Sequence, residues 1–348
     1  MTITVGINGF GRIGRCTLSH ISESAREDIK VVKINATGPL DTAAHLIRYD
    51  SVHGRFPGEV TTGEGWMDLG RGRFEVMSTY DMDELDWSGV DVVLECTGNF
   101  NDGEKAKKHI DRGAKSVLIS APAKNVQKTI VMGVNDDQLT AGDVMISNGS
   151  CTTNCLAPLA KVLDDKIGIE SGIMTTIHSY TGDQPTLDRR HNDLYRARAA
   201  AMSMIPTSTG AAKALGEVLP KLKGKLDGSA MRVPTPNVSA VDLTFIAARD
   251  VTEEEVNAII AEAAHGAMKG ILEYDTEPKV SIDFNHTEAS SIFAADQTKV
   301  TGGRLVRVLS WYDNEWGFSC RMADVAVAMG KLLKSEVAPN DAVRHELV

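Results

Sequence analysis

The chain has 348 residues, a length that exceeds a typical single core and suits two domains. Its 42% apolar and 24% charged residues are typical of a soluble globular protein, and its formal net charge of −10 argues against nucleic acid as the main partner, because phosphate binding needs a basic surface. We find no run of 18 apolar residues and no secretory signal, so we expect no membrane span and a cytoplasmic protein, for which five scattered cysteines suit a reducing compartment.

The first half of the chain alternates short apolar runs with helical segments. The expected strands are 2–9, 29–34, 90–98, 115–123 and 143–148, and the expected helices are 12–22 and 102–112. Strands that alternate with helices predict βαβ units and a parallel sheet.

Beyond about residue 171 the apolar runs become longer and alternate with polar residues. This pattern predicts a larger mixed or antiparallel sheet that is covered on one face. Helices are expected near 210–218 and 252–268, and the second begins with a capping box in which Glu255 follows Thr252 by three residues.

The last helix is expected over 317–333, where Met322, Val325, Met329 and Leu332 recur at helical spacing. An amphipathic helix at the end of the chain needs a surface to cover. We expect it to dock on the first domain.

A glycine-rich stretch joins the first strand to the first helix. Gly9, Gly11 and Gly14 form the pattern G-x-G-x-x-G, which lets backbone amides approach a pyrophosphate at the helix N-terminus. This context favours dinucleotide binding over a plain strand–helix turn. The acidic residue that usually binds the ribose should follow about 20 residues later, where the chain has Ala36.

Cys151 lies among small polar residues at the apparent start of a helix, a position that lowers the pKa of a thiol and favours a nucleophile. The alternative is that Cys151 and Cys155 are small buried residues, and for Cys155 we favour that alternative. A metal site at this C-x3-C pair is not expected, because no second pair of soft ligands lies nearby in the sequence.

A nucleophilic cysteine needs a base, and His178 ends an apolar run in the second half. A single histidine at a strand end is more often structural than catalytic. Spacing alone does not choose between His178 and four other candidates, which are His45, His53, His191 and His286.

Several blocks occur in one order along the chain: INGFGRIGR, SNxSCTTNC, TTIHSYTGDQ, RARAAA, IPTSTGAAKA, GKLDG, RVPTPNVS and SWYDNEWGFS. Together they resemble the phosphorylating glyceraldehyde-3-phosphate dehydrogenases along nearly the whole chain. The resemblance implies an α/β fold with a Rossmann-type dinucleotide-binding domain (1–150 and 315–348, with the C-terminal helix returning to it). It also implies an α+β catalytic domain with a large mixed or antiparallel sheet (151–314), and a homotetramer.

The resemblance also assigns the chemistry. Cys151 is the implied nucleophile and His178 the implied base. The expected reaction oxidises D-glyceraldehyde 3-phosphate through a cysteine thioester, which inorganic phosphate cleaves to 1,3-bisphosphoglycerate, and it is reversible.

Two phosphate sites are implied by the same family. The substrate phosphate would contact Thr181 and Arg232. The attacking phosphate would contact Ser150, Thr152, Thr209 and Gly210.

The implied cofactor residues surround the glycine-rich stretch and the catalytic centre. Asn314 and Tyr312 fall in the block that faces the nicotinamide. The remaining expected cofactor contacts are Gly9, Phe10, Gly11, Arg12, Ile13, Gly14, Asn35, Ala36, Thr37, Thr97 and Ser120.

Departures from the family concern the choice between NAD and NADP. Relatives that use NAD have an aspartate where this chain has Ala36, and the hydroxyl of Thr37 follows it. Arg189 and Arg190 replace a common Leu-Pro in a loop that approaches the cofactor of a neighbouring subunit. We therefore expect use of NADP, alone or alongside NAD, although Arg189 and Arg190 could instead form a solvated or ion-paired surface pair.

Two further departures are Gly149, where alanine is usual, and Tyr80, where arginine is common; their roles are left open. An erythrose-4-phosphate dehydrogenase is an alternative, because the wording SIDFNH (281–286) is shared with that branch. A non-catalytic binding protein is less favoured, because Cys151 and His178 are both intact. The physiological direction, glycolytic or gluconeogenic, is also left open.

Overall fold

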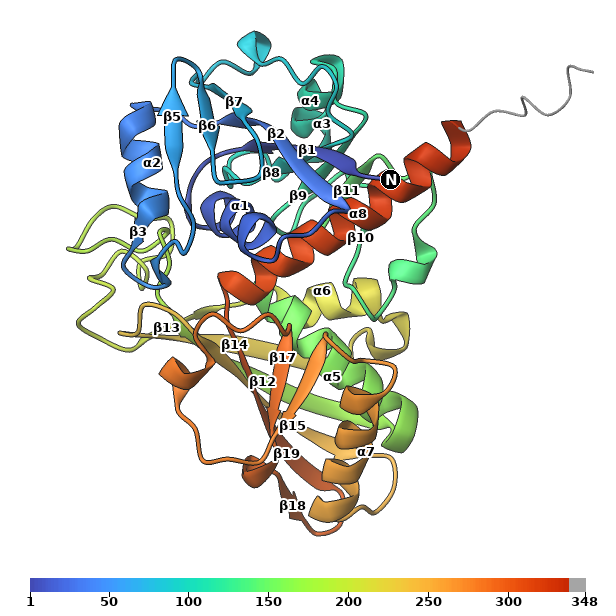
Figure 1. The fold of residues 1–348 in the computed structure, drawn as a ribbon. Helices are drawn as coiled ribbons and strands as arrows, with labels where there is room; N and C mark the ends of the chain where they lie inside the picture. Colours follow the sequence, from blue (N-terminus) through green and yellow to red (C-terminus); the bar gives the residue numbers. More distant parts are fainter. Residues whose placement is uncertain (338–348) are drawn as a thin grey trace, which may run out of the picture.

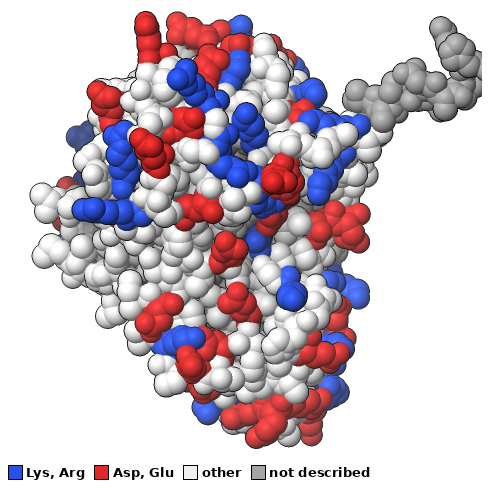
Figure 2. All heavy atoms as spheres, in the orientation of Figure 1, with Lys and Arg blue, Asp and Glu red and all other residues white. Residues whose placement is uncertain are grey.

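The fold consists of two large sheets at opposite ends of the molecule, each covered by helices (Figure 1). It is seen in a computed structural model that describes residues 1–337. No helix in this range is both long and apolar enough to cross a membrane. Figure 2 shows acidic and basic side chains interspersed over the face in view.

The first sheet has nine strands in the order β10-β11-β9-β8-β1-β2-β7-β6-β5. Their bounds are β1 Ile3–Asn8, β2 Ile29–Asn35, β5 Thr61–Gly63, β6 Trp66–Asp68, β7 Phe74–Met77, β8 Val92–Glu95, β9 Ser116–Ile119, β10 Lys128–Thr129 and β11 Met145–Ser147. In this spatial order, all neighbouring strands from β10 to β7 pair in parallel, as the alternation predicts. Strands β6 and β5 add an antiparallel edge. Because β1 pairs with β2 on one side and β8 on the other, the strand order reverses at β1, where ligands bind in such sheets.

The helices of this half are short except for α1 and α8. Their bounds are α1 Arg12–Glu23, α2 Leu40–Arg48, α3 Gly103–Ala106, α4 Lys108–Asp111 and α8 Trp316–Val337. Helix α8 packs along α1 and against β1 and β8, as expected for the last helix (Figure 1).

Some boundaries differ from the sequence-based expectation. The helix expected over 102–112 is two short helices, α3 and α4, that meet at Lys107. The strand expected over 90–98 is only Val92–Glu95, because the Glu95 carboxylate accepts the Thr97 amide and Gly98 takes a positive φ of 73°. Helix α2 and the edge strands β5 and β6 were not predicted, and neither was the hairpin of β3 (Tyr49–Asp50) and β4 (Gly54–Arg55).

The second sheet has the order β13-β14-β12-β15-β19-β17-β16, with β18 paired to β19. The strands are β12 Ile169–Ser179, β13 Ile205–Ser208, β14 Leu226–Val233, β15 Ser239–Ala247, β16 Leu272–Asp275, β17 Ser291–Ala294, β18 Lys299–Thr301 and β19 Leu305–Tyr312. Pairs β12–β14 and β16–β17 are parallel and the others antiparallel, which confirms the expected mixed sheet.

Three helices accompany this sheet: α5 Cys151–Ile167, α6 Ala211–Val218 and α7 Glu253–His265. The Thr252 hydroxyl accepts the Glu255 amide at 3.2 Å, so the predicted N-terminal cap of α7 is present. Helix α5 is buried along most of its length, and its first residue, Cys151, packs against the hydrophobic cores of both halves. The fold therefore places the N-terminus of α5 at the junction of the two sheets.

Candidate active site

Cys151 and His178 come together from α5 and β12. Ser150 caps the helix by accepting the Thr153 amide at 3.0 Å, which holds Cys151 in the first turn. The Cys151 Sγ lies 3.5 Å from His178 Nε2. His178 Nδ1 lies 2.7 Å from the Ser179 carbonyl oxygen, an acceptor, and 3.2 Å from Arg232 Nη1, which also donates to that carbonyl. The shorter contact, to an oxygen that can only accept, favours a proton on Nδ1, which leaves Nε2 to accept one from the thiol.

The other candidate histidines lie elsewhere. His53 and His286 contact each other near α8, His191 pairs with Asp183, and His45 lies beside Tyr49. Among the described residues, His178 is therefore the histidine that contacts Cys151. Cys155 is fully buried, as expected, and contacts Ser291.

Burial acts on both members of the pair. Burial raises the pKa of the Cys151 thiol, against the lowering effects of Arg232 and of the Thr152 amide and hydroxyl. Burial and then Arg232 lower the pKa of His178 to about 3, whereas a general base works best with a pKa near the working pH. An anion bound at Arg232 would cancel part of this effect and raise the basicity of His178.

The pair faces a cavity of about 350 Å³ that is built to receive an anion. The cavity is lined by Pro122, Ser150, Cys151, Thr152, Thr176, His178, Arg196, Ser208, Thr209, Gly210, Ala211, Ala230 and Arg232. The first turns of α5 and α6 both border it, and helix N-termini favour negative charge. Thr181, the remaining expected phosphate ligand, accepts a hydrogen bond from Arg232 Nη1 at 3.4 Å.

Two guanidinium groups contribute to this cavity. Arg232 Nη1 donates to the Ser179 carbonyl, while its buried Nε has no hydrogen-bond partner among residues 1–337. Arg196 is held by Asp183 and by the Thr207 hydroxyl, each at 3.0 Å. Arg196 was not assigned from the sequence, although it lies within the RARAAA block. Paired guanidinium groups match the geometry and charge of phosphate.

Tyr312 and Asn314 lie under the catalytic pair. The Tyr312 hydroxyl contacts the hydroxyls of Thr152 at 2.9 Å and Thr176 at 2.8 Å, and its ring meets His178 edge-on. Tyr312 therefore contacts residues on both sides of the pair, Thr152 beside Cys151 and the His178 ring itself. The Asn314 Oδ1 accepts hydrogen bonds from two serine hydroxyls, Ser179 and Ser239, which leaves its Nδ2 as a donor.

A second cavity, of about 360 Å³, lies at the carboxyl ends of β1, β2 and β8, where the strand order reverses. It is lined by Asn8, Gly9, Phe10, Gly11, Asn35, Thr37, Thr79, Tyr80, Met82, Leu85, Cys96, Thr97, Asn99 and Phe100. A crevice at this point of a parallel sheet, beside the glycine-rich turn, is suited to a dinucleotide.

A buried carboxylate that the sequence did not single out supports this crevice. Glu95 accepts the Thr97 amide at 2.8 Å and the Asn8 side-chain amide at 2.6 Å, and it contacts the buried His109 at 2.9 Å. Asn35 in turn donates to Asn8 at 2.8 Å. The network holds the ends of β1, β2 and β8 in one arrangement.

Other expected cofactor residues do not line the crevice. Ala36 is 4% exposed and packs in the core of the first sheet, while its amide bonds to Met77. The Arg12 guanidinium pairs with Asp50 and Glu315. A Cβ at Gly14 would lie 2.2 Å from the Gly9 carbonyl oxygen, so glycine is needed there for packing.

The remaining expected cofactor residues are distributed over three places. Ile13 packs against the core of the first sheet, and Ser120 follows β9, with its amide bonded to the Glu95 carbonyl. Arg189 and Arg190 are exposed on the long segment between β12 and β13. Neither arginine side chain makes an ion pair with the residues 1–337.

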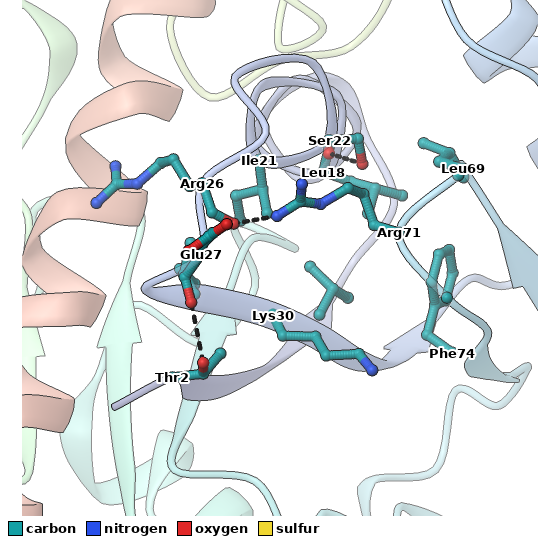
Figure 3. Close-up of a pocket in the computed structure, with 14 residues that line it drawn as sticks. Thr2, Leu18, Ile21, Ser22, Arg26, Glu27, Lys30, Leu69, Arg71 and Phe74 are labelled. Atoms are coloured by element: carbon teal, nitrogen blue, oxygen red, sulfur yellow. Dashed lines mark hydrogen bonds between the residues drawn. The ribbon is translucent and has the colours of Figure 1, made fainter.

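A third cavity, of about 560 Å³, is separate from both sites and lies between α1, β2 and residues 69–74 (Figure 3). Some of its polar groups bond within the protein: Arg71 donates to the Arg26 carbonyl, and the hydroxyls of Thr2 and Ser22 donate to backbone oxygens. Its lining residues include no nucleophile paired with a base, so the Cys151 cavity is the candidate catalytic site.

Comparison with known proteins decides the family. Residues 3–103 match the family described as "Glyceraldehyde 3-phosphate dehydrogenase, NAD binding domain", and residues 150–314 match "Glyceraldehyde 3-phosphate dehydrogenase, C-terminal domain". The chain belongs to the glyceraldehyde-3-phosphate dehydrogenase family. The resemblance and the fold class expected from the sequence are therefore confirmed, and the protein is an oxidoreductase with a nicotinamide-dinucleotide-binding domain.

Individual relatives in this dehydrogenase family cover the chain almost fully. The chain is 66% identical over 333 residues to glyceraldehyde-3-phosphate dehydrogenase of Cereibacter sphaeroides. This alignment covers 96% of the chain and 100% of the relative. Identity is 62% over 334 residues to the enzyme of the same name from Xanthobacter flavus, with 95% and 100% covered. For glyceraldehyde-3-phosphate dehydrogenase 2 of Bacillus subtilis it is 52% over 328 residues, with 93% and 96% covered. These relatives do not favour the erythrose-4-phosphate alternative.

Proposed function

We propose that this dehydrogenase oxidises D-glyceraldehyde 3-phosphate to 1,3-bisphosphoglycerate, reversibly, with inorganic phosphate and a nicotinamide dinucleotide. The observation that carries the proposal is the 3.5 Å contact between Cys151 and His178 inside a cavity that also holds Arg196 and Arg232. A thiol, a base and two phosphate-binding cations in one cavity match an aldehyde substrate that carries phosphate.

The chain's own residues perform the covalent steps. His178 Nε2 takes the thiol proton, and the Cys151 sulfur attacks the aldehyde carbon, which gives a hemithioacetal. The dinucleotide supplies the hydride acceptor that oxidises this carbon. The resulting thioester is attacked by inorganic phosphate, so the carbon–sulfur bond breaks and the acyl phosphate leaves. Covalent capture divides one difficult step into easier ones.

We propose that the two phosphates bind at different sides of the cavity. The substrate phosphate contacts Arg232 and Thr181, and the attacking phosphate contacts the hydroxyls of Ser150, Thr152 and Thr209, with Gly210. The N-termini of α5 and α6 support this assignment, because the bound groups are anionic.

The catalytic proposal is tested by initial rates with the two sugar phosphates, glyceraldehyde 3-phosphate and erythrose 4-phosphate, with and without inorganic phosphate. We expect turnover of the first that depends on added phosphate and on Cys151, so that Cys151→Ser is inactive. Phosphate-independent oxidation, or faster turnover of erythrose 4-phosphate, would overturn the proposal. A binding role that survives Cys151→Ser would favour the non-catalytic alternative.

For the cofactor, we propose use of NADP, alone or alongside NAD. Three features support it: position 36 offers no carboxylate to repel a 2′-phosphate, the Thr37 hydroxyl lines the crevice, and Arg189 and Arg190 are not engaged in ion pairs with residues 1–337. We infer that these arginines reach the cofactor of a neighbouring subunit in a homotetramer.

Rates with each cofactor test this choice. A kcat/KM for NAD far above that for NADP would contradict it. Replacing Arg189 and Arg190 with alanine should reduce kcat/KM for NADP roughly tenfold or more, with a smaller effect for NAD, because a charge-assisted hydrogen bond contributes about 1.5–3 kcal/mol. Ala36→Asp should also reduce NADP use more than NAD use; since Ala36 is buried, the folding of that variant must be verified.

We further propose a cytoplasmic location and retain the domain division of 1–150 with 315–348 and 151–314. The two separate sheets, and the packing of α8 on the first of them, support this division into two domains. Residues 338–348 of the proposed first domain lie outside the described residues.

A further inference from the structure

Three side chains of metal-ligand type converge where α1, α8 and the segment 285–290 meet. His20 lies on α1, Cys320 on α8 and Glu288 on the segment that leads into β17. Cys320 Sγ is 3.3 Å from His20 Nδ1, and Nδ1 is 3.9 Å from a Glu288 carboxylate oxygen. The three donor atoms all lie within 4.8 Å of one another.

We propose that His20, Glu288 and Cys320 form a binding site for a borderline-soft divalent cation such as Zn²⁺. In a tetrahedral zinc site the bonds of ~2.0–2.3 Å separate neighbouring donor atoms by roughly 3.3–3.6 Å. The 3.3 Å between Cys320 Sγ and His20 Nδ1 already matches this separation. The Glu288 carboxylate oxygen, 3.9 Å from Nδ1, has to move closer by less than the length of a covalent bond. Glu288 is free to do so, because its side chain is 65% exposed. Its exposure also leaves the fourth position to water.

The contacts suit binding, because His20 Nδ1 faces both the Cys320 sulfur and a Glu288 carboxylate oxygen. A cysteine ligates a metal as the thiolate. When the cation binds, a metal–sulfur bond forms and the thiol proton is released to solvent.

The two neighbouring arginines are paired with two carboxylates. Arg321 pairs with Asp324 at 2.9 Å, and Arg26 pairs with Asp324 at 2.5 Å and with Asp28 at 2.9 Å. Two negative charges therefore accompany these two positive charges.

A second group of the same composition provides a contrast on the other side of Trp316. Cys16, His53 and Glu315 also place their donor atoms within 4.8 Å. There, Arg12 donates to both carboxylate oxygens of Glu315, at 2.8 Å and 2.5 Å, and His53 contacts the same group. The Arg12 guanidinium therefore already pairs with the Glu315 carboxylate and supplies the positive charge that a metal ion would bring. We expect no metal ion at Cys16, His53 and Glu315.

Binding at the proposed site would link both halves of the molecule. The segment 285–290 leads into β17 of the second sheet, whereas α1 and α8 pack on the first (Figure 1). A ligand that binds the folded chain alone raises its stability. Occupancy should therefore raise the Tm.

The test uses the full chain with Cys151→Ser, because the thiol of Cys151 beside His178 could otherwise bind the added metal ion and give a thiolate band of its own. Co²⁺ is titrated into this protein and followed by absorbance, and Zn²⁺ is then added as a competitor. We expect one Co²⁺ per chain, a thiolate-to-cobalt charge-transfer band, displacement by Zn²⁺ and a higher Tm with Zn²⁺.

Matched variants assign the ligands. Glu288→Gln on the surface should weaken the affinity roughly tenfold or more, and Cys320→Ala should abolish the charge-transfer band. Two control variants should change neither the affinity nor the charge-transfer band. Glu277→Gln alters a similarly exposed carboxylate, and Cys16→Ala removes the buried thiol on the other side of Trp316.

The absence of a thiolate band in the Cys151→Ser protein would overturn the proposal, and so would a band that Cys16→Ala removes. If Cys320→Ala does not fold, Glu288→Gln decides, and unchanged affinity in that variant would exclude the site.

Discussion

At the scale of single residues, the proposed catalytic pair of Cys151 and His178 depends on which atom holds one proton. The Ser179 carbonyl accepts the His178 Nδ1 proton and leaves Nε2 directed at the thiol. Burial disfavours the charged form of each partner separately, but a thiolate beside an imidazolium carries no net charge. The two groups therefore titrate as a pair, and the removal of one shifts the pKa of the other.

Replacement of His178 with asparagine should raise the pKa of the Cys151 thiol. Asparagine cannot take the proton, so burial acts on the thiol without an opposite charge, and the midpoint of alkylation should move upward by roughly 1–3 pH units. The measurement is the rate of iodoacetamide alkylation against pH. His45→Asn on α2 is the control and should leave the profile unchanged. An unshifted midpoint in His178→Asn would show that the pair is not coupled.

Arg196 provides a second prediction at this scale, because it lines the anion cavity while Arg198, two residues later, pairs with Asp188 at the surface. Arg196→Gln should reduce kcat/KM roughly tenfold or more through lost phosphate contacts. Arg198→Gln should leave the rate almost unchanged. Steady-state kinetics with varied glyceraldehyde 3-phosphate and varied inorganic phosphate will show which phosphate Arg196 binds, and equal behaviour of the two variants would refute its assignment.

At the scale of elements, the return of α8 to the first sheet is held by a buried carboxylate as well as by packing. Asp91, which precedes β8, accepts hydrogen bonds from Thr4 of β1, from Lys115 and from Lys334 of α8. Burial raises the pKa of Asp91, but these partners outweigh it and bring the pKa to about 2. The carboxylate thus joins α8 to the strands beneath it.

Asp91→Asn should lower the free energy of unfolding at neutral pH. The folded pKa is about 2 and the ordinary value is 3.8, so the stabilisation of about 2 kcal/mol is present above pH 3.8 and is lost as the pH falls through 2. Urea unfolding should therefore show a smaller difference in the free energy of unfolding between wild type and variant at pH 3 than at pH 7. Asp86→Asn removes a comparable but exposed pair with Lys33 and should have little effect at either pH.

At the scale of the whole molecule, the second sheet has one face that no helix of the described chain covers. On β12 the buried Met174 and Thr176 alternate with Ile173 and Ile177, which are exposed, and Leu305 on β19 is also exposed. Strand β15 lies between β12 and β19, and the pairing registers place Ile173, Ile177 and Leu305 on the same face of the sheet. Exposed apolar side chains that share one face are typical of a subunit interface. This pattern supports the proposed homotetramer.

Light scattering should therefore give a mass four times that of the chain. Ile173→Glu places a charge on the apolar face and should yield smaller species, since an unpaired charge is costly to bury in an interface. Thr61→Glu at the exposed edge strand β5 serves as the control and should keep the wild-type mass. A tetramer that tolerates Ile173→Glu would show that this face lies outside the interface.

The sequence by itself determined the features that depend on local pattern. Glycine spacing after a strand predicted the dinucleotide crevice, alternation predicted the parallel and mixed sheets, and the distinctive blocks around Cys151 and His178 identified the family. Local rules work here because turns, caps and sheet faces depend on neighbouring residues. Edge strands β5 and β6 lacked such a pattern, since short strands at a sheet edge bury few side chains.

Tertiary structure alone decided which distant side chains meet. Spacing left five histidines open and the family resemblance implied His178, but only the structure shows its 3.5 Å contact with Cys151. Arg196 joins the anion cavity through a loop that no periodicity describes. The Glu95 network and the proposed cation site at residues 20, 288 and 320 were likewise not predicted. The reason is physical: these groups are far apart along the chain, and their contacts exist only after the two cores and α8 have packed together.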